Sequence, residues 1–153
     1  MLTIFNAQKE YIMKHEFREL KIWQKARTLN KEIYKVSKTF PKEELYGLTS
    51  QIRRASISVP SNISEGSGYD SDAQFLRYLY IALGSLCEVE TQLYLSSDID
   101  YISTKQLELT LVKTDELKRM IIGYMKSLKK SNKFNLGFLT LAFLFSIQLV
   151  LNK

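Results

Sequence analysis

The sequence predicts an all-α protein that folds as an antiparallel, up-down-up-down four-helix bundle and assembles as a homo-oligomer. Apolar residues recur every three or four positions through four long segments, the spacing that keeps them on one face of a helix. The breaks between these segments are short and polar, which makes consecutive helices antiparallel neighbours. Two prolines and six glycines in 153 residues are too few for the many turns of a sandwich or barrel.

The first helix is predicted over residues 16–38, with one apolar face and one basic face. Pro41 is predicted at the first position of the second helix, because its missing N–H and fixed φ suit that position. The apolar stripe continues past Pro60, so we expect a kink there rather than an end. Gly66 and Gly68 are expected to end this helix.

The third helix carries two apolar stripes, and the pair Ser71 and Gln74 forms a capping-box pattern at its start. The second stripe consists of Leu76, Tyr80, Leu83, Cys87 and Tyr94. A small monomer can hardly bury a helix on two sides, so this stripe predicts a subunit interface. A wide stripe buried within one bundle is the alternative, and the periodicity does not separate the two.

The fourth helix begins with a second capping box, Ser103 with Gln106. It is expected to end in the basic run at residues 126–133, because cations are favoured at a helix C-terminus. The bundle is therefore predicted to span residues 13–133. Met13 followed by Lys14 could be a translation start, which would leave residues 1–12 as an extension that is not native. A genuine N-terminal arm is the alternative.

Residues 134–153 form an apolar C-terminal tail of different composition. Thirteen of the eighteen residues at 134–151 are apolar and none is charged. Eighteen helical residues span roughly 27 Å, just short of a hydrocarbon core of ~30 Å. The lysines before the tail would keep that side cytoplasmic, so a tail anchor at the inner membrane is one interpretation. Packing on the bundle, packing in an oligomer seam and read-through past a stop are the others.

The residue types needed for catalysis are scarce. One histidine (His15) and one cysteine (Cys87) are present, and neither a Glu-x-x-His pair nor a phosphate-binding glycine loop occurs. Four serines lie close together, but His15 is at the other end of the chain: Ser56, Ser58, Ser61 and Ser64. We therefore expect no enzymatic activity, no metal and no cofactor. The single cysteine excludes an internal disulfide and indicates a reducing cytoplasm.

The charge pattern is more informative than the motifs. Residues 14–42 hold nine cations and three anions, and residues 113–133 hold seven cations and two anions. Residues 88–108, by contrast, are acidic. The first and last helices of such a bundle can be neighbours, and their merged positive field would attract RNA or DNA. The candidate binding residues are Lys21, Lys25, Arg27, Lys31, Arg53, Arg54, Lys118 and Arg119. The alternatives are a solvated basic surface and, for Arg53 and Arg54, a subunit contact.

Three stretches resemble a known family: FRELKIWQKA (17–26), FPKEELYGLTSQIRRASISVPSNISEG (40–66) and FLRYLYIALGSLCEVETQLYLS (75–96). They are similar to the four-helix-bundle family of 23S rRNA-intervening-sequence proteins, also called S23 ribosomal protein-like. The resemblance implies a small bacterial protein, a homopentamer and no enzymatic activity. A related branch, the retroelement accessory variability determinants, binds a reverse transcriptase and nucleic acid. The tail after residue 133 and the stretch before Met13 depart from the family pattern.

The sequence thus favours a cytoplasmic, non-enzymatic oligomeric bundle that binds nucleic acid through a basic surface. The alternatives are a scaffold for a protein partner, for example a reverse-transcriptase accessory, and a tail-anchored bundle associated with the membrane through residues 134–151.

Overall fold

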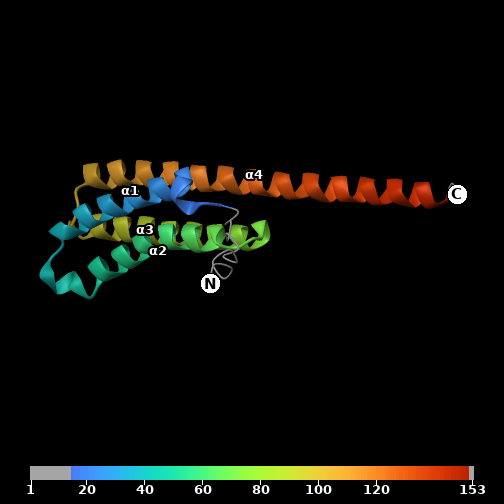
Figure 1. Ribbon diagram of the computed structural model, residues 1–153. Helices are drawn as coiled ribbons and strands as arrows, with labels where there is room; N and C mark the ends of the chain where they lie inside the picture. The colour runs from blue at the N-terminus through green and yellow to red at the C-terminus, as the bar shows by residue number, and fades with distance from the viewer. Residues whose placement is uncertain (1–14, 152–153) are drawn as a thin grey trace, which may run out of the picture.

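The computed structural model describes the backbone of residues 15–151 and the side chains of residues 15–130. Four α-helices account for its architecture: α1 (Lys21–Val36), α2 (Leu48–Ser67), α3 (Asp72–Asp98) and α4 (Thr104–Leu151). Each helix packs against the next, and α1 also packs against α4, which closes the ring of four (Figure 1). The predicted all-α four-helix bundle is confirmed.

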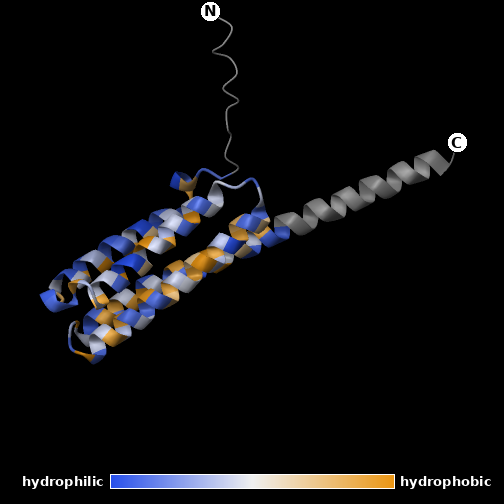
Figure 2. Ribbon diagram, turned by 90° about the horizontal axis from the view of Figure 1, so that it is seen from below, coloured by the Kyte–Doolittle hydropathy of each residue, from blue (hydrophilic) through white to orange (hydrophobic). Residues whose placement is uncertain are grey.

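The core is built from the apolar stripes that face the bundle axis. Polar and apolar residues alternate along each helix of the bundle (Figure 2), as expected for helices with one buried face. The fully buried positions come from all four helices, and the largest of them include Phe75, Ile33, Ile52, Ile63, Leu79, Leu86, Leu93, Leu117 and Ile121. Burial of these side chains is the main force that holds the helices together.

Helix α1 is shorter than the predicted span of residues 16–38. Separate 3₁₀ turns at Phe17–Glu19 and Ser37–Thr39 flank it. The first turn is distinct because Leu20 is extended and because the Glu16 carboxylate caps it, accepting a hydrogen bond from the Arg18 N–H at 3.2 Å. The capped turn and the extended residue after it interrupt the helix. The spacing of the apolar residues stays the same across this break, so the sequence pattern does not reveal it.

Helix α2 begins at Leu48, so the predicted start at Pro41 is wrong. Pro41 instead precedes a short 3₁₀ turn at Lys42–Leu45. The carboxylate of Glu44 accepts a hydrogen bond from the Leu48 N–H at 2.8 Å, which satisfies a donor that the first turn of a helix leaves unpaired. At the other end the helix continues through Pro60, as predicted, and ends at Ser67, so that Gly68 caps it as expected whereas Gly66 lies within the helix.

The two predicted capping boxes have different outcomes. At Ser103 the box forms, because the Ser103 N–H donates to Gln106 Oε1 at 3.0 Å and the Gln106 N–H donates to Ser103 Oγ at 3.3 Å. At Ser71 the side chain makes no capping bond. The first turn of α3 carries the buried Asp72 instead, and an acidic side chain there is favoured by the helix dipole.

Helix α4 does not end in the basic run at residues 126–133. It continues to Leu151, well past the ends of the other helices (Figure 1), because residues 134–151 contain no proline and many good helix formers. The proposed extension at residues 1–12 and the side chains of the tail lie outside the described residues. Among residues 15–130, no helix is long and apolar enough to cross a membrane.

Candidate nucleic-acid interface

Helices α1 and α4 are neighbours, as the charge argument required, but acidic side chains neutralise the seam between them. Lys25 Nζ lies 2.5 Å from Glu116 Oε2, and Lys113 Nζ lies 3.3 Å from Glu32 Oε2. Two nearby lysines lower the pKa of the Glu32 carboxyl by donating hydrogen bonds to it. The bond from Lys35 has the larger effect, and the bond from Lys113 adds to it. The cations of the two helices therefore do not merge into one positive field along this seam.

Lys118 is held between α4 and α3. Its Nζ lies 2.6 Å from Glu90 Oε2, and the hydroxyl of Thr114 donates to Glu90 Oε1 at 2.8 Å. The hydrogen bond to Glu90 raises the pKa of the Lys118 ammonium. Lys118 thus joins two helices, and its charge is largely compensated within the chain.

Arg53 is half-buried rather than exposed, and its alternative placement at a subunit contact stays a prediction. Its Nε donates to Ser37 Oγ at 2.8 Å, and its guanidinium lies 4.9 Å from the centre of the Tyr34 ring. Arg53 therefore ties α2 to the end of α1. Arg54, one position further along the helix, is exposed as expected.

A small groove lies between α1 and α2. The exposed guanidinium of Arg27 lies 4.8 Å from the centre of the Trp23 ring at one side of this groove. The groove has a volume of about 280 Å³ and is lined by Trp23, Arg27, Asn30, Ile57, Pro60, Ser61 and Ser64. Asn30 donates to Ser56 Oγ at 2.9 Å, which links the two helices beneath it. A cation beside an aromatic ring is a combination that suits a nucleotide.

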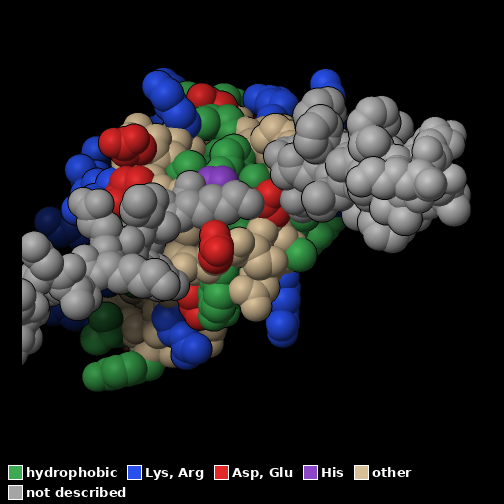
Figure 3. Space-filling model, turned by 45° about the vertical axis from the view of Figure 1, so that its right-hand side comes forward, with side chains coloured by type: hydrophobic (Ala, Val, Ile, Leu, Met, Phe, Trp, Pro, Cys, Tyr) green, Lys and Arg blue, Asp and Glu red, His purple; other side chains and the backbone are tan. Residues whose placement is uncertain are grey.

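The eight predicted cations do not form one patch. Lys21, Arg27 and Lys31 are exposed on α1 and make no ion pair with any described residue. Arg54 lies on α2 and Arg119 on α4, both exposed. On the face seen in Figure 3, Lys and Arg side chains lie at several separate places, with Asp and Glu side chains between them. Of the eight predicted cations, the exposed face of α1 holds three that make no ion pair with a described residue, more than any other helix.

The second apolar stripe of α3 lies on the outside of the bundle. Tyr80 is 54% exposed and Tyr94 is 51% exposed, while Leu76 and Leu83 are partly buried. Cys87 is exposed as well. Tyr80, Cys87 and Tyr94 are thus left exposed by the described residues of one chain, which disfavours the alternative of a single wide stripe inside the bundle.

A polar cluster around His15 was not predicted. His15 Nε2 lies 3.4 Å from Asp72 Oδ1, and the hydroxyl of Tyr124 lies 3.2 Å from His15 Nδ1. The His15 ring also packs on Phe75, with ring centres 5.1 Å apart. Burial raises the pKa of the Tyr124 hydroxyl. The cluster attaches the start of the described chain to α3 and α4, and no sequence signal marks residues so far apart as partners.

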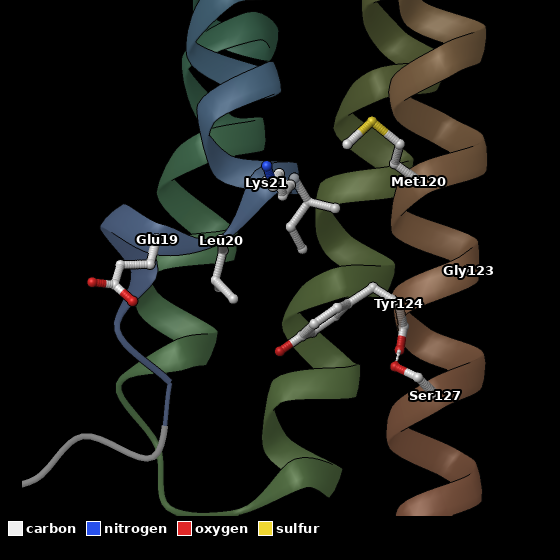
Figure 4. A pocket seen from close by; sticks show the side chains of 8 residues that line it. Glu19, Leu20, Lys21, Met120, Gly123, Tyr124 and Ser127 are labelled. Carbon is white, nitrogen blue, oxygen red and sulfur yellow. Dashed lines mark hydrogen bonds between the residues drawn. The ribbon is translucent and has the colours of Figure 1, made fainter.

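A second pocket of about 480 Å³ lies beside this cluster, between the start of α1 and α4. Leu20 and the Tyr124 ring face each other across it, and Met120 lies above them (Figure 4). Its walls are mainly apolar.

The four clustered serines are occupied with structural hydrogen bonds. Ser56, Ser61 and Ser64 each donate to a backbone carbonyl of α2, and Ser58 bonds to Ser85 at 2.8 Å. Among residues 15–130, no group of three His, Cys, Asp or Glu side chains could hold a metal ion.

Comparison with known proteins agrees with the fold. The family model for 23S rRNA-intervening sequence proteins matches residues 18–123. A similar crystal structure is that of a protein of unknown function from the S23 ribosomal protein family of Bacteroides thetaiotaomicron. The two sequences are 26% identical, and the two structures superpose with a TM-score of 0.64. The match covers 69% of this chain and 98% of the Bacteroides chain. No curated protein matches. The family model covers most of the bundle, and the chain belongs to the 23S rRNA-intervening sequence protein family.

Proposed function

We propose that this protein is a non-enzymatic, oligomeric bundle of the cytoplasm that binds nucleic acid through the exposed face of α1. The observation that carries the proposal is the set of exposed cations Lys21, Arg27 and Lys31 on this helix, for which no described residue is an ion-pair partner. Ten residues of helix separate the first from the last, which is about 15 Å. A row of cations of this length can contact several phosphates, and the released counterions favour binding without reading sequence.

Reversing these charges should abolish binding to mixed-sequence RNA at low salt. In Lys21→Glu/Arg27→Glu/Lys31→Glu, three attractive phosphate contacts become repulsive, whereas Lys25 is left in place so that its ion pair with Glu116 survives. Fluorescence anisotropy of a labelled RNA measures the affinity. The matched control reverses three exposed cations of α4, in Arg119→Glu/Lys126→Glu/Lys130→Glu. An equal loss in both variants would assign binding to net charge rather than to α1.

We also propose that the outer stripe of α3 is the interface between copies, with the pentamer suggested by the family resemblance. Exposed tyrosines are favoured at interfaces because each buries a large apolar area with little loss of side-chain freedom. This stripe lies on α3, whereas the proposed nucleic-acid surface lies on α1, and these two helices are not neighbours in the bundle. Assembly through α3 would therefore leave the basic face of α1 accessible.

Placing carboxylates in the stripe should dissociate the assembly. Tyr80→Glu/Tyr94→Glu would bury charges at the interface, which is strongly unfavourable. Light scattering of the full chain should give an oligomer for the parent protein and a smaller species for this variant. Tyr46→Glu is the control, because Tyr46 is 90% exposed and lies outside α3. A monomeric parent protein would contradict the assignment of this stripe.

A protein scaffold is the second candidate function, favoured by the same exposed stripe if a different protein covers it. Capture of a defined protein partner after nuclease treatment, together with no RNA binding at low salt, would establish this function in place of the first.

A further inference from the structure

We infer that the groove between α1 and α2 is a subsite for one unpaired nucleotide, so that the protein binds single-stranded nucleic acid in preference to duplex. The inference rests on the proposed function and adds the class of nucleic acid and the place where a base is held. Three residues of α1 and four of α2 line this groove: Trp23, Arg27, Asn30, Ile57, Pro60, Ser61 and Ser64.

One wall of the groove is the cation–aromatic pair of Arg27 and Trp23. The Phe17 ring meets the Trp23 ring edge-on, with centres 4.9 Å apart and planes at 75°, which holds the indole in place. The Arg27 guanidinium lies over the same indole. A guanidinium positioned on an aromatic ring can stack on a base or bind a phosphate through its N–H groups. Lys31, one turn further along α1, is exposed and can contact the next phosphate.

The other wall comes from α2 and combines apolar surface with acceptor oxygens. Ile57 is 43% exposed, and Pro60 beside it has no N–H. The hydroxyls of Ser61 and Ser64 donate to the carbonyls of Ile57 and Ser61. Their remaining lone pairs are therefore acceptors for the amino or imino N–H groups of a base.

The size and the chemistry of the groove both favour a single base. Its volume of about 280 Å³ is below the roughly 300–1,000 Å³ of pockets for drug-sized ligands. A base can enter such a groove only when its face and edge are free, which is the case in single strands and loops. In a duplex the bases are stacked and paired, so only the phosphates would meet α1.

The single tryptophan of the chain gives a direct readout of this groove. We would titrate the full chain with a 12-nucleotide single strand of RNA and with the duplex of the same sequence, recording Trp23 emission and the anisotropy of the labelled RNA together. The single strand should quench Trp23 emission in parallel with the rise in anisotropy, and should bind at least tenfold more tightly than the duplex. Binding without a change in emission, or equal affinity for both RNAs, would overturn the inference and leave the proposed function standing. No binding of either RNA would overturn both.

A variant tests the same groove without touching its aromatic wall. Ser61 is exposed, so Ser61→Glu places a carboxylate at the rim without disturbing the core. It should weaken single-strand binding about tenfold or more and change duplex binding less. The control is Gln51→Glu, which adds the same charge at another exposed position of α2. Circular dichroism checks that both variants are folded, and equal weakening by the two would contradict the inference.

Discussion

Replacing Phe75 with alanine should destabilise the protein by about 3–5 kcal/mol, the range for removing a buried aromatic ring. Phe75 is fully buried and is the largest of the completely buried side chains among the described residues. Its ring packs against His15 and Tyr124, with ring centres 5.1 and 5.5 Å away. The truncation therefore removes a contact surface shared by α3, α4 and the start of the chain, and the backbone can fill the cavity only in part.

Urea denaturation at one fixed protomer concentration measures this loss, because assembly makes apparent stability depend on concentration. Phe75→Leu keeps most of the side-chain volume, so it should lose clearly less stability than Phe75→Ala. Tyr46→Ala, at an almost fully exposed position, should stay within about 0.5 kcal/mol of the parent protein. A loss below about 1 kcal/mol for Phe75→Ala would contradict the described packing, given the usual range for such truncations.

Replacing Gly66 with alanine should also destabilise the protein, although alanine is the better helix former. A Cβ at this position would lie 2.6 Å from the Cβ of Tyr78 and 2.8 Å from a ring carbon of Phe75. The Cβ of Tyr78 moves only with the α3 backbone, so α2 and α3 would have to separate. Overpacking typically costs about 1–3 kcal/mol, whereas the gain in helix propensity is about 1 kcal/mol. Both contacts are shorter than 3.0 Å, so the cost should lie in the upper part of that range, about 2–3 kcal/mol, and the net loss should be about 1–2 kcal/mol.

Gly123→Ala is the matched control for this substitution. Gly123 also lies within a helix, but apart from the neighbouring backbone of its own helix no described heavy atom lies within 4 Å of the Cβ it would gain. This substitution should stabilise the protein by about 0.5–1 kcal/mol. The two glycines should therefore shift the urea midpoint in opposite directions, and a stabilising Gly66→Ala would show that α2 and α3 are not so closely packed.

Periodicity predicted the existence and type of the four helices, because the apolar stripes depend only on residues near one another in sequence. The ends of the helices depended on side chains that periodicity does not consider. Glu44 caps α2 from a separate turn, which moved the start away from Pro41. Leu20 interrupts the predicted first helix although it belongs to the same apolar stripe.

The candidate site was harder to predict because it depends on which side chains meet across helices. Lys25 and Lys118 belonged to basic segments of the sequence, yet each has a carboxylate partner on another helix, Glu116 and Glu90 respectively. These pairs follow from the register between neighbouring helices, which composition does not contain. The pairing of Arg27 with Trp23 is local, four residues apart on one helix, and this spacing could have been recognised in the sequence.

The salt dependence of RNA affinity tests most directly whether the α1 cations bind phosphates. We would measure the binding constant of the full chain for an unstructured RNA at several salt concentrations, and repeat it with Lys21→Gln/Arg27→Gln/Lys31→Gln. For single strands each phosphate contact contributes about −0.7 to the slope of the logarithm of affinity against the logarithm of salt. The parent protein should show a steep negative slope. In the neutralised variant, which lacks three contacts, the magnitude of this slope should be smaller by about 2. An affinity independent of salt, or the same slope in both proteins, would contradict the proposed function.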